Sequence, residues 1–136
     1  MRSKLFILPV LALLASVSSA SAAVYKCNMT TTAAGFGFLS PEIYFDFSQN
    51  NTEGRVLDRL VQHVYGEPIA ASVKSVRKNV YRIRWEVKNV PTRGRTDVNM
   101  NFSAHLDLNS KKLNLLGYLP SNNQEATGRG RCALDQ

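Results

Sequence analysis

The side chains best suited to acid–base chemistry are the two histidines, His63 and His105. His105 lies between Ser103 and Asp107 in an alternating segment, so these three side chains share one side of a predicted strand. Neighbours on one strand face are about 6–7 Å apart, too far for the direct hydrogen bonds of a Ser-His-Asp relay. The sequence contains no nucleophile elbow and no glycine-rich phosphate loop. We therefore expect a solvated polar face, no catalytic residue, no cofactor and a protein that is not an enzyme.

Arginine is the other informative residue type, because its guanidinium group binds phosphate and carboxylate in a bidentate manner. Arginine pairs recur in two Arg-Gly-Arg segments, and a predicted strand over 81–88 turns two more arginines outward. The candidate anion-binding residues are Arg82, Arg84, Arg93, Arg95, Arg129 and Arg131. Scattered solvated charge is the alternative. Whether the arginines form one surface depends on the order of the strands.

The amino-terminal 22 residues have the architecture of a secretory signal peptide. Arg2 and Lys4 precede an apolar stretch over 5–14, and Ala20-Ser21-Ala22 supplies the small residues after which signal peptidase cuts. The apolar stretch is shorter than the about 20 residues that a membrane span needs. We expect cleavage to leave 23–136 as a single domain in the periplasm or outside the cell, and not as a transmembrane protein. Removing residues 1–22 lowers the formal net charge from +7 to +5.

The two cysteines, Cys27 and Cys132, lie near opposite ends of this predicted domain. An even number of cysteines in an exported chain predicts a disulfide bond. A zinc site needs about four ligands, and these cysteines together with the two histidines lack metal-ligand spacing. We therefore expect no metal site and one disulfide that closes almost the whole domain into a loop.

Alternation of apolar and polar residues is the clearest structural signal. Every even position from 98 to 108 is apolar and every odd position is polar. A period of two is typical of strands that place one face in a core. Shorter or weaker runs of the same kind occupy 25–29, 43–48, 69–76, 81–88, 112–119 and 126–134.

The segment from Arg55 to Tyr65 is compatible with two structures. Its apolar residues recur at helical spacing, with Thr52 as a candidate cap at the start and Gly66 at the end. A twisted strand through Val56 is the rival interpretation.

A sheet with one apolar face must bury that face, and at most one helix is available to cover it. The prediction is an all-β fold with at most one short helix, in which an antiparallel up-and-down barrel of about 7–8 strands leaves no open edge. The first and last strands of such a barrel are neighbours, and Cys27 and Cys132 lie on them at inward positions. Gly128 and Gly130 fit close backbone approach near this seam.

An apolar segment that contains glycine carries Phe36 and Phe38 shortly before Pro41. Aromatic side chains are frequent anchors of binding surfaces, so these two are candidate loop contacts for a partner. The favoured alternative is a loop that folds over the barrel mouth as part of the core.

The ending Gly128-Arg129-Gly130-Arg131-Cys132, together with the early Tyr25-Lys26-Cys27, resembles a pattern in small exported bacterial proteins of unknown function. Gly66-Glu67-Pro68-Ile69-Ala70 before a strand and Trp85 within one fit this resemblance. The layout is also similar, at the level of the fold, to periplasmic barrel inhibitors of c-type lysozyme. This chain departs from those inhibitors in its basic charge, because lysozyme is itself basic.

The basic charge favours a non-enzymatic binding module that engages an anionic partner or a lipid surface of the cell envelope. One alternative is a small lipocalin-like carrier with an apolar ligand in the barrel, and another is an inhibitor of a cell-wall hydrolase. Tyr81, Trp85, Met100 and Phe102 are large residues expected to fill the interior, which disfavours the carrier. An exported chain is not expected to meet nucleic acid.

Overall fold

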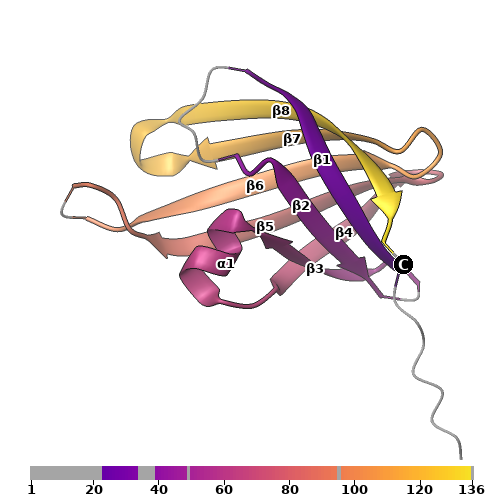
Figure 1. Cartoon of the computed structure of the whole chain (residues 1–136), viewed down its shortest axis with the longest axis horizontal. Helices are drawn as coiled ribbons and strands as arrows, with labels where there is room; N and C mark the ends of the chain where they lie inside the picture. The colour runs from indigo at the N-terminus through magenta and orange to yellow at the C-terminus, as the bar shows by residue number, and fades with distance from the viewer. Residues whose placement is uncertain (1–22, 34–38, 49, 95, 136) are drawn as a thin grey trace, which may run out of the picture.

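The structure, a computed structural model, describes residues 23–33, 39–48, 50–94 and 96–135. In chain order the elements are β1 (Ala23–Ala33), β2 (Glu42–Phe47), β3 (Glu53–Asp58), α1 (Arg59–Tyr65), β4 (Ile69–Arg77), β5 (Val80–Val90), β6 (Val98–Asp107), β7 (Lys112–Leu119), the 3₁₀ helix η1 (Pro120–Asn122) and β8 (Gln124–Leu134). Each strand pairs antiparallel with the next, and β8 pairs back to β1, so the sheet closes (Figure 1). This confirms the predicted all-β, up-and-down barrel with one short helix.

The alternating residues turn their apolar side chains into the barrel. Trp85 is 5% exposed and lies between Phe45 and Phe102, with ring centroids 5.6 Å and 5.2 Å away. Tyr81 is half-buried and contacts Phe47 at a centroid distance of 6.4 Å. Aromatic rings at such separations add to the stability gained by burial. These aromatic side chains therefore occupy space inside the barrel, as the sequence predicts for Trp85 and Phe102.

The seam of the barrel lies between β1 and β8. The register places Cys27 directly opposite Cys132, and the two form the predicted disulfide across a sequence separation of 105. A Cβ added to Gly130 would lie 2.6 Å from the backbone oxygen of Asn28, so only glycine fits this approach of the two strands. A disulfide of this kind is typical of proteins outside the cytosol.

The segment 55–65 combines the two alternatives left open by the sequence. β3 continues to Asp58, and the chain becomes helical at Arg59. The expectation that Thr52 caps the helix is wrong, because Asp58 is the N-cap and its carboxylate accepts a 2.8 Å hydrogen bond from the Val61 amide. Gly66 ends the helix in the left-handed conformation with φ of 74°, as predicted.

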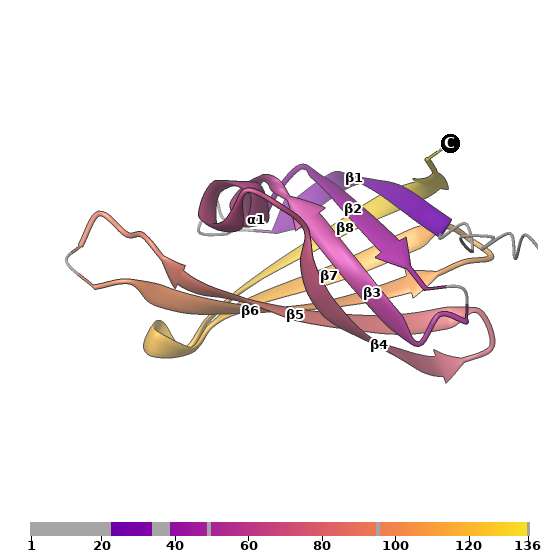
Figure 2. The ribbon, with the colours of Figure 1, turned by 90° about the horizontal axis from the view of Figure 1, so that it is seen from below.

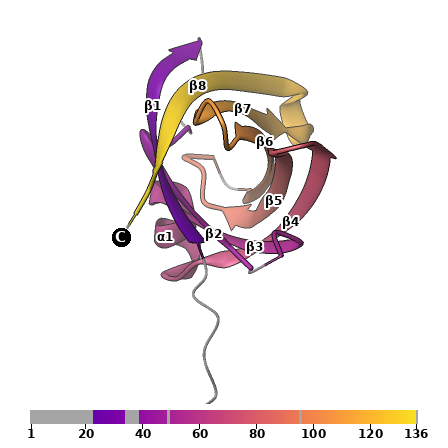
Figure 3. The same ribbon diagram turned by 90° about the vertical axis from the view of Figure 1, so that its right-hand side faces the viewer.

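The two ends of the barrel differ. The β2–β3, β4–β5 and β6–β7 turns lie at the end that also holds Ala23 and Leu134, whereas α1, η1 and the β5–β6 hairpin lie at the other (Figures 1 and 2). The β5–β6 hairpin projects beyond the neighbouring strands in Figure 2, and Figure 3 shows the strands as a ring. Within the described ranges, no helix is long and apolar enough to cross a membrane. The predicted signal peptide over 1–22, Phe36 and Phe38 lie outside those ranges.

Candidate anion-binding face

Two of the candidate arginines lie in one row across the outer surface of the barrel. Arg82 on β5 faces His105 on β6. On the other side of His105, Asn114 of β7 faces Arg129 of β8. Since neighbouring strands are about 4.8 Å apart, the backbones at Arg82 and Arg129 are about 14 Å apart. The strand order thus brings together arginines that are distant in the sequence.

Other cations extend this row. Arg84 lies two positions beyond Arg82 on the same outer face, and Lys74 of β4 faces Arg82. On β8, Arg131 follows Arg129 and faces Lys112 of β7. All of these side chains are exposed except that of Arg82, which is half-buried. The basic face is defined here as Lys74, Arg82, Arg84, Lys112, Arg129 and Arg131.

No acidic side chain in the described ranges lies within ion-pair distance of these six cations. The ion pair found in those ranges joins Lys26 to Glu42 on β1 and β2, with 3.5 Å between nitrogen and oxygen. None of the six cationic side chains donates a hydrogen bond within the described part of the chain. The positive charge of the basic face is therefore compensated by solvent and counterions, and an anion that binds there would relieve the mutual repulsion of the cations.

The acidic residues on the same strands lie elsewhere or have another role. Asp107 is close to the basic face, but its Oδ1 accepts hydrogen bonds from the backbone amides of Asn109 at 2.8 Å and Ser110 at 3.2 Å. These bonds lower the pKa of Asp107 and hold the β6–β7 turn. Glu86 and Glu125 lie toward the opposite end of β5 and β8. On β5 and β8 the arginines of the basic face thus lie nearer one end of the strand, and these glutamates lie nearer the other.

The remaining candidate arginines lie away from this face. Arg93 lies in the β5–β6 loop at one end of the barrel (Figure 1), whereas Arg129 lies in the middle of β8 and Arg131 lies farther toward the opposite end. Arg95 lies outside the described residues. The structure therefore brings together Arg82, Arg84, Arg129 and Arg131, and it separates Arg93 from them.

The two histidines lie on separate elements, and neither forms a side-chain hydrogen bond or an ion pair within the described part of the chain. His105 is exposed on β6, and His63 is exposed on α1. The Oδ1 atom of Asp107 accepts bonds from turn amides, and no hydrogen bond joins the side chains of Ser103, His105 and Asp107 in the described residues. Within the described residues, no group of three or more histidine, cysteine or acidic side chains could hold a metal ion.

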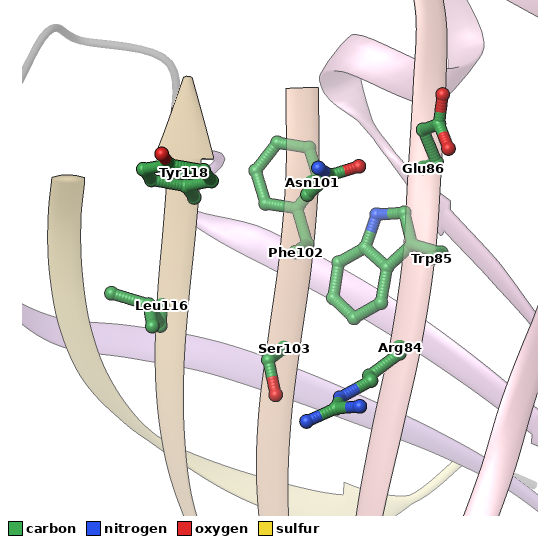
Figure 4. A pocket seen from close by; sticks show the side chains of 8 residues that line it. All are labelled: Arg84, Trp85, Glu86, Asn101, Phe102, Ser103, Leu116 and Tyr118. Atoms are coloured by element: carbon green, nitrogen blue, oxygen red, sulfur yellow. The ribbon is translucent and has the colours of Figure 1, made fainter. Parts of the chain in front are cut away.

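A shallow groove of about 310 Å³ adjoins the basic face on β5, β6 and β7 (Figure 4). Its residues are Arg84, Trp85, Glu86, Asn101, Phe102, Ser103, Leu116 and Tyr118. Among these, Arg84 is the one residue that the sequence offered as a candidate for anion binding. The other outward side chains meet only because three strands are aligned in register, and the period of two along each strand was the only sequence signal that they face outward.

A second groove of about 360 Å³ lies where α1 packs beside β2 and β3. At its edge the Tyr44 hydroxyl donates a 2.7 Å hydrogen bond to Glu42, which is also paired with Lys26. The bond from Tyr44, followed by the charge of Lys26, lowers the pKa of Glu42. The carboxylate of Glu42 thus stays ionised and already has two partners, a hydroxyl group and an ammonium group.

No protein-family model, no curated protein and no solved structure matches this chain significantly.

Proposed function

We propose that the chain is an exported, non-enzymatic binding module whose basic face attaches to anionic groups of the cell envelope. The observation that supports this most strongly is the convergence of Arg82, Arg84, Arg129 and Arg131 on neighbouring strands with no acidic partner in the described residues. In the periplasm, such anionic groups are the headgroups of phospholipids and glycolipids. The signal-like segment over 1–22 and the Cys27–Cys132 bond fit a protein that works outside the cytosol.

The magnitude of this attraction follows from the number of cations. A basic residue near an anionic membrane surface contributes about 1 kcal/mol. Six cations therefore give at most about 6 kcal/mol, which corresponds to a dissociation constant on the order of tens of micromolar. The barrel surface is curved, so the outermost cations will lie farther from a flat membrane and contribute less. Binding of this strength is reversible and depends strongly on salt.

The packing of the interior offers less support for the carrier alternative. Trp85 and Phe102 stack at 5.2 Å, and Phe45 packs against the indole edge to face, so large rings fill the space where an apolar ligand would sit. An eight-stranded barrel has room either for its own side chains or for one small ligand. A module that binds through its outer surface is more consistent with this interior.

Co-sedimentation with lipid vesicles tests the proposal. Vesicles of phosphatidylglycerol and of phosphatidylcholine should be compared at about 0.01 M and about 0.15 M salt, because exposed charges are screened over about 30 Å and about 8 Å respectively. A soluble acidic glycan added as competitor distinguishes recognition of a sugar from recognition of a lipid phosphate. We expect binding to the anionic vesicles alone, with a loss at the higher salt. Equal binding to both vesicle types would contradict the proposal.

A further inference from the structure

We propose that the groove on β5, β6 and β7 is a subsite for the ring of an acidic saccharide, a sugar that carries a carboxylate or a phosphate. This inference rests on the proposed function and deepens it, because it names the class of anionic ligand that the basic face attracts. The groove volume of about 310 Å³ lies at the lower end of the range of about 300–1,000 Å³ for ligand pockets, which suits one or two sugar rings.

The register arranges six outward side chains in two rows. In one row, Ser103 lies between Arg84 and Leu116. In the other, Asn101 lies between Glu86 and Tyr118. Figure 4 shows the result, with an apolar wall along β7, a charged wall along β5 and two small polar side chains on β6 between them.

The apolar wall suits one face of a sugar ring. Pyranose rings present C–H groups on their faces and hydroxyl groups at their edges, so they pack against aromatic and aliphatic side chains. The Tyr118 hydroxyl donates a 3.0 Å hydrogen bond to Asn123, which holds the phenol ring in place. Leu116 lies two positions before it on the same face of β7 and extends the apolar contact. A ring held in place before binding loses little conformational entropy when the ligand arrives.

The polar groups of the groove match the edge of a sugar. Each sugar hydroxyl both donates and accepts hydrogen bonds, so a site that binds it must offer both kinds of partner. The Asn101 amide and the Ser103 hydroxyl do both, Glu86 accepts and Arg84 donates. None of these four side chains forms a hydrogen bond or ion pair within the described residues, so all four are available to a ligand.

The charges fix the direction of the ligand. Along β5, Arg84 lies at the end of the groove that is nearer Arg82, whereas Glu86 lies at the other end. An acidic substituent will therefore point toward the two arginines, and uncharged hydroxyls will face the carboxylate of Glu86. This arrangement selects for one negative charge at one end of the sugar.

The base of the groove is rigid. β6 pairs with a neighbour along both edges, and the stacked rings of Trp85 and Phe102 lie beneath the groove on the inner side. Sites built on paired strands over a packed core hold their side chains more precisely than sites on loops.

An NMR titration of the purified protein tests the inference, with glucuronate, glucose and inorganic phosphate as probes at matched ionic strength. Glucuronate should shift the backbone amide signals of Asn101, Ser103 and Tyr118, and glucose should shift the same signals at higher concentration. Phosphate should act mainly on the basic face. Arg84→Gln should weaken glucuronate binding about tenfold and change glucose binding little, because the lost contact is a charge-assisted hydrogen bond.

Two further variants in the groove allow the inference to be tested even if one variant folds poorly. Tyr118→Ala and Asn101→Ala should each weaken the binding of both sugars. Asn114→Ala is the matched control, because Asn114 is exposed on the same face of β7 but lies outside the groove. If neither sugar binds while anionic vesicles still do, this inference fails and the proposed function stands. If neither the sugars nor the vesicles bind, the proposed function fails as well.

Discussion

Removal of the Cys27–Cys132 disulfide should destabilise the barrel without changing its fold. The bond closes a loop across a sequence separation of 105. The chain-entropy model gives a stabilisation of about 4.7 kcal/mol for a loop of about 100 residues, an upper figure if the unfolded chain is compact. Because whole domains are stable by only about 5–15 kcal/mol, this bond supplies a large share of the total. The paired backbones of β1 and β8 remain to direct the same closure.

The test is thermal unfolding of the double variant Cys27→Ala/Cys132→Ala beside the wild-type protein. A loss of about 4–5 kcal/mol should lower the melting temperature by roughly 15–20 °C. Cys27 is 0% exposed and Cys132 is 5% exposed, so the alanines also leave a small void. Unfolding of reduced wild-type protein separates the two effects, since reduction breaks the bond and keeps the sulfur atoms. A double variant and a reduced protein that both melt within a few degrees of the oxidised wild type would refute the reasoning.

Four further predictions concern the core, the helix cap, the seam and processing. Trp85→Ala should cost about 3–5 kcal/mol in chemical denaturation, and Trp85→Phe clearly less, because the buried indole N–H has no hydrogen-bond partner to lose in the described residues. Burial raises the pKa of Asp58 above the ordinary 3.8, so the folded state binds this proton more tightly than the unfolded state does. The stability gained in this way is fully present below pH 3.8 and is lost as the pH rises through the raised pKa. Asp58→Asn keeps a capping oxygen and should flatten that part of the curve of stability against pH. Gly130→Ala should cost about 1–3 kcal/mol, because its Cβ would press on the Asn28 carbonyl; an unchanged melting temperature would show that the seam can relax. Amino-terminal sequencing of the exported protein should begin at Ala23, and an intact Met1 in the membrane fraction would contradict cleavage.

The barrel could be predicted from the sequence, because each strand has one buried and one exposed face, and its apolar residues therefore recur with a period of two. The run from Val98 to Leu108 shows this most clearly. The disulfide was predicted from the even number of cysteines in an exported chain, and the closure of the barrel supports it, since a closed meander makes its first and last strands neighbours. The segment 55–65 was harder to predict, because Asp58 both ends β3 and caps α1. The strand period and the helix period overlap in this segment, so the strand interpretation was right for its first part and the helix interpretation for its second part.

The candidate site was only partly predictable, because outward residues on different strands meet according to register. Arg93 follows Arg82 and Arg84 closely in the sequence. The strand β5 extends to Val90, however, and carries Arg93 to the far end of the barrel. To predict that Arg82 and Arg129 lie in one row, the order of four strands must be known. To predict the groove at Tyr118, the register of β6 against both β5 and β7 must be known.

The most direct test of the central claim compares two variants that remove the same charge from different places. One variant changes Arg82, Arg84, Arg129 and Arg131 to Gln, and the other changes Arg55, Arg59, Lys88 and Arg93 to Gln. At no more than about 1 kcal/mol for each cation near the surface, the first variant should bind phosphatidylglycerol vesicles up to about a thousandfold more weakly than the wild type. The second should keep most of the wild-type affinity, because its cations lie off the basic face. Equal losses in the two variants would show that net charge, and not the basic face, determines binding.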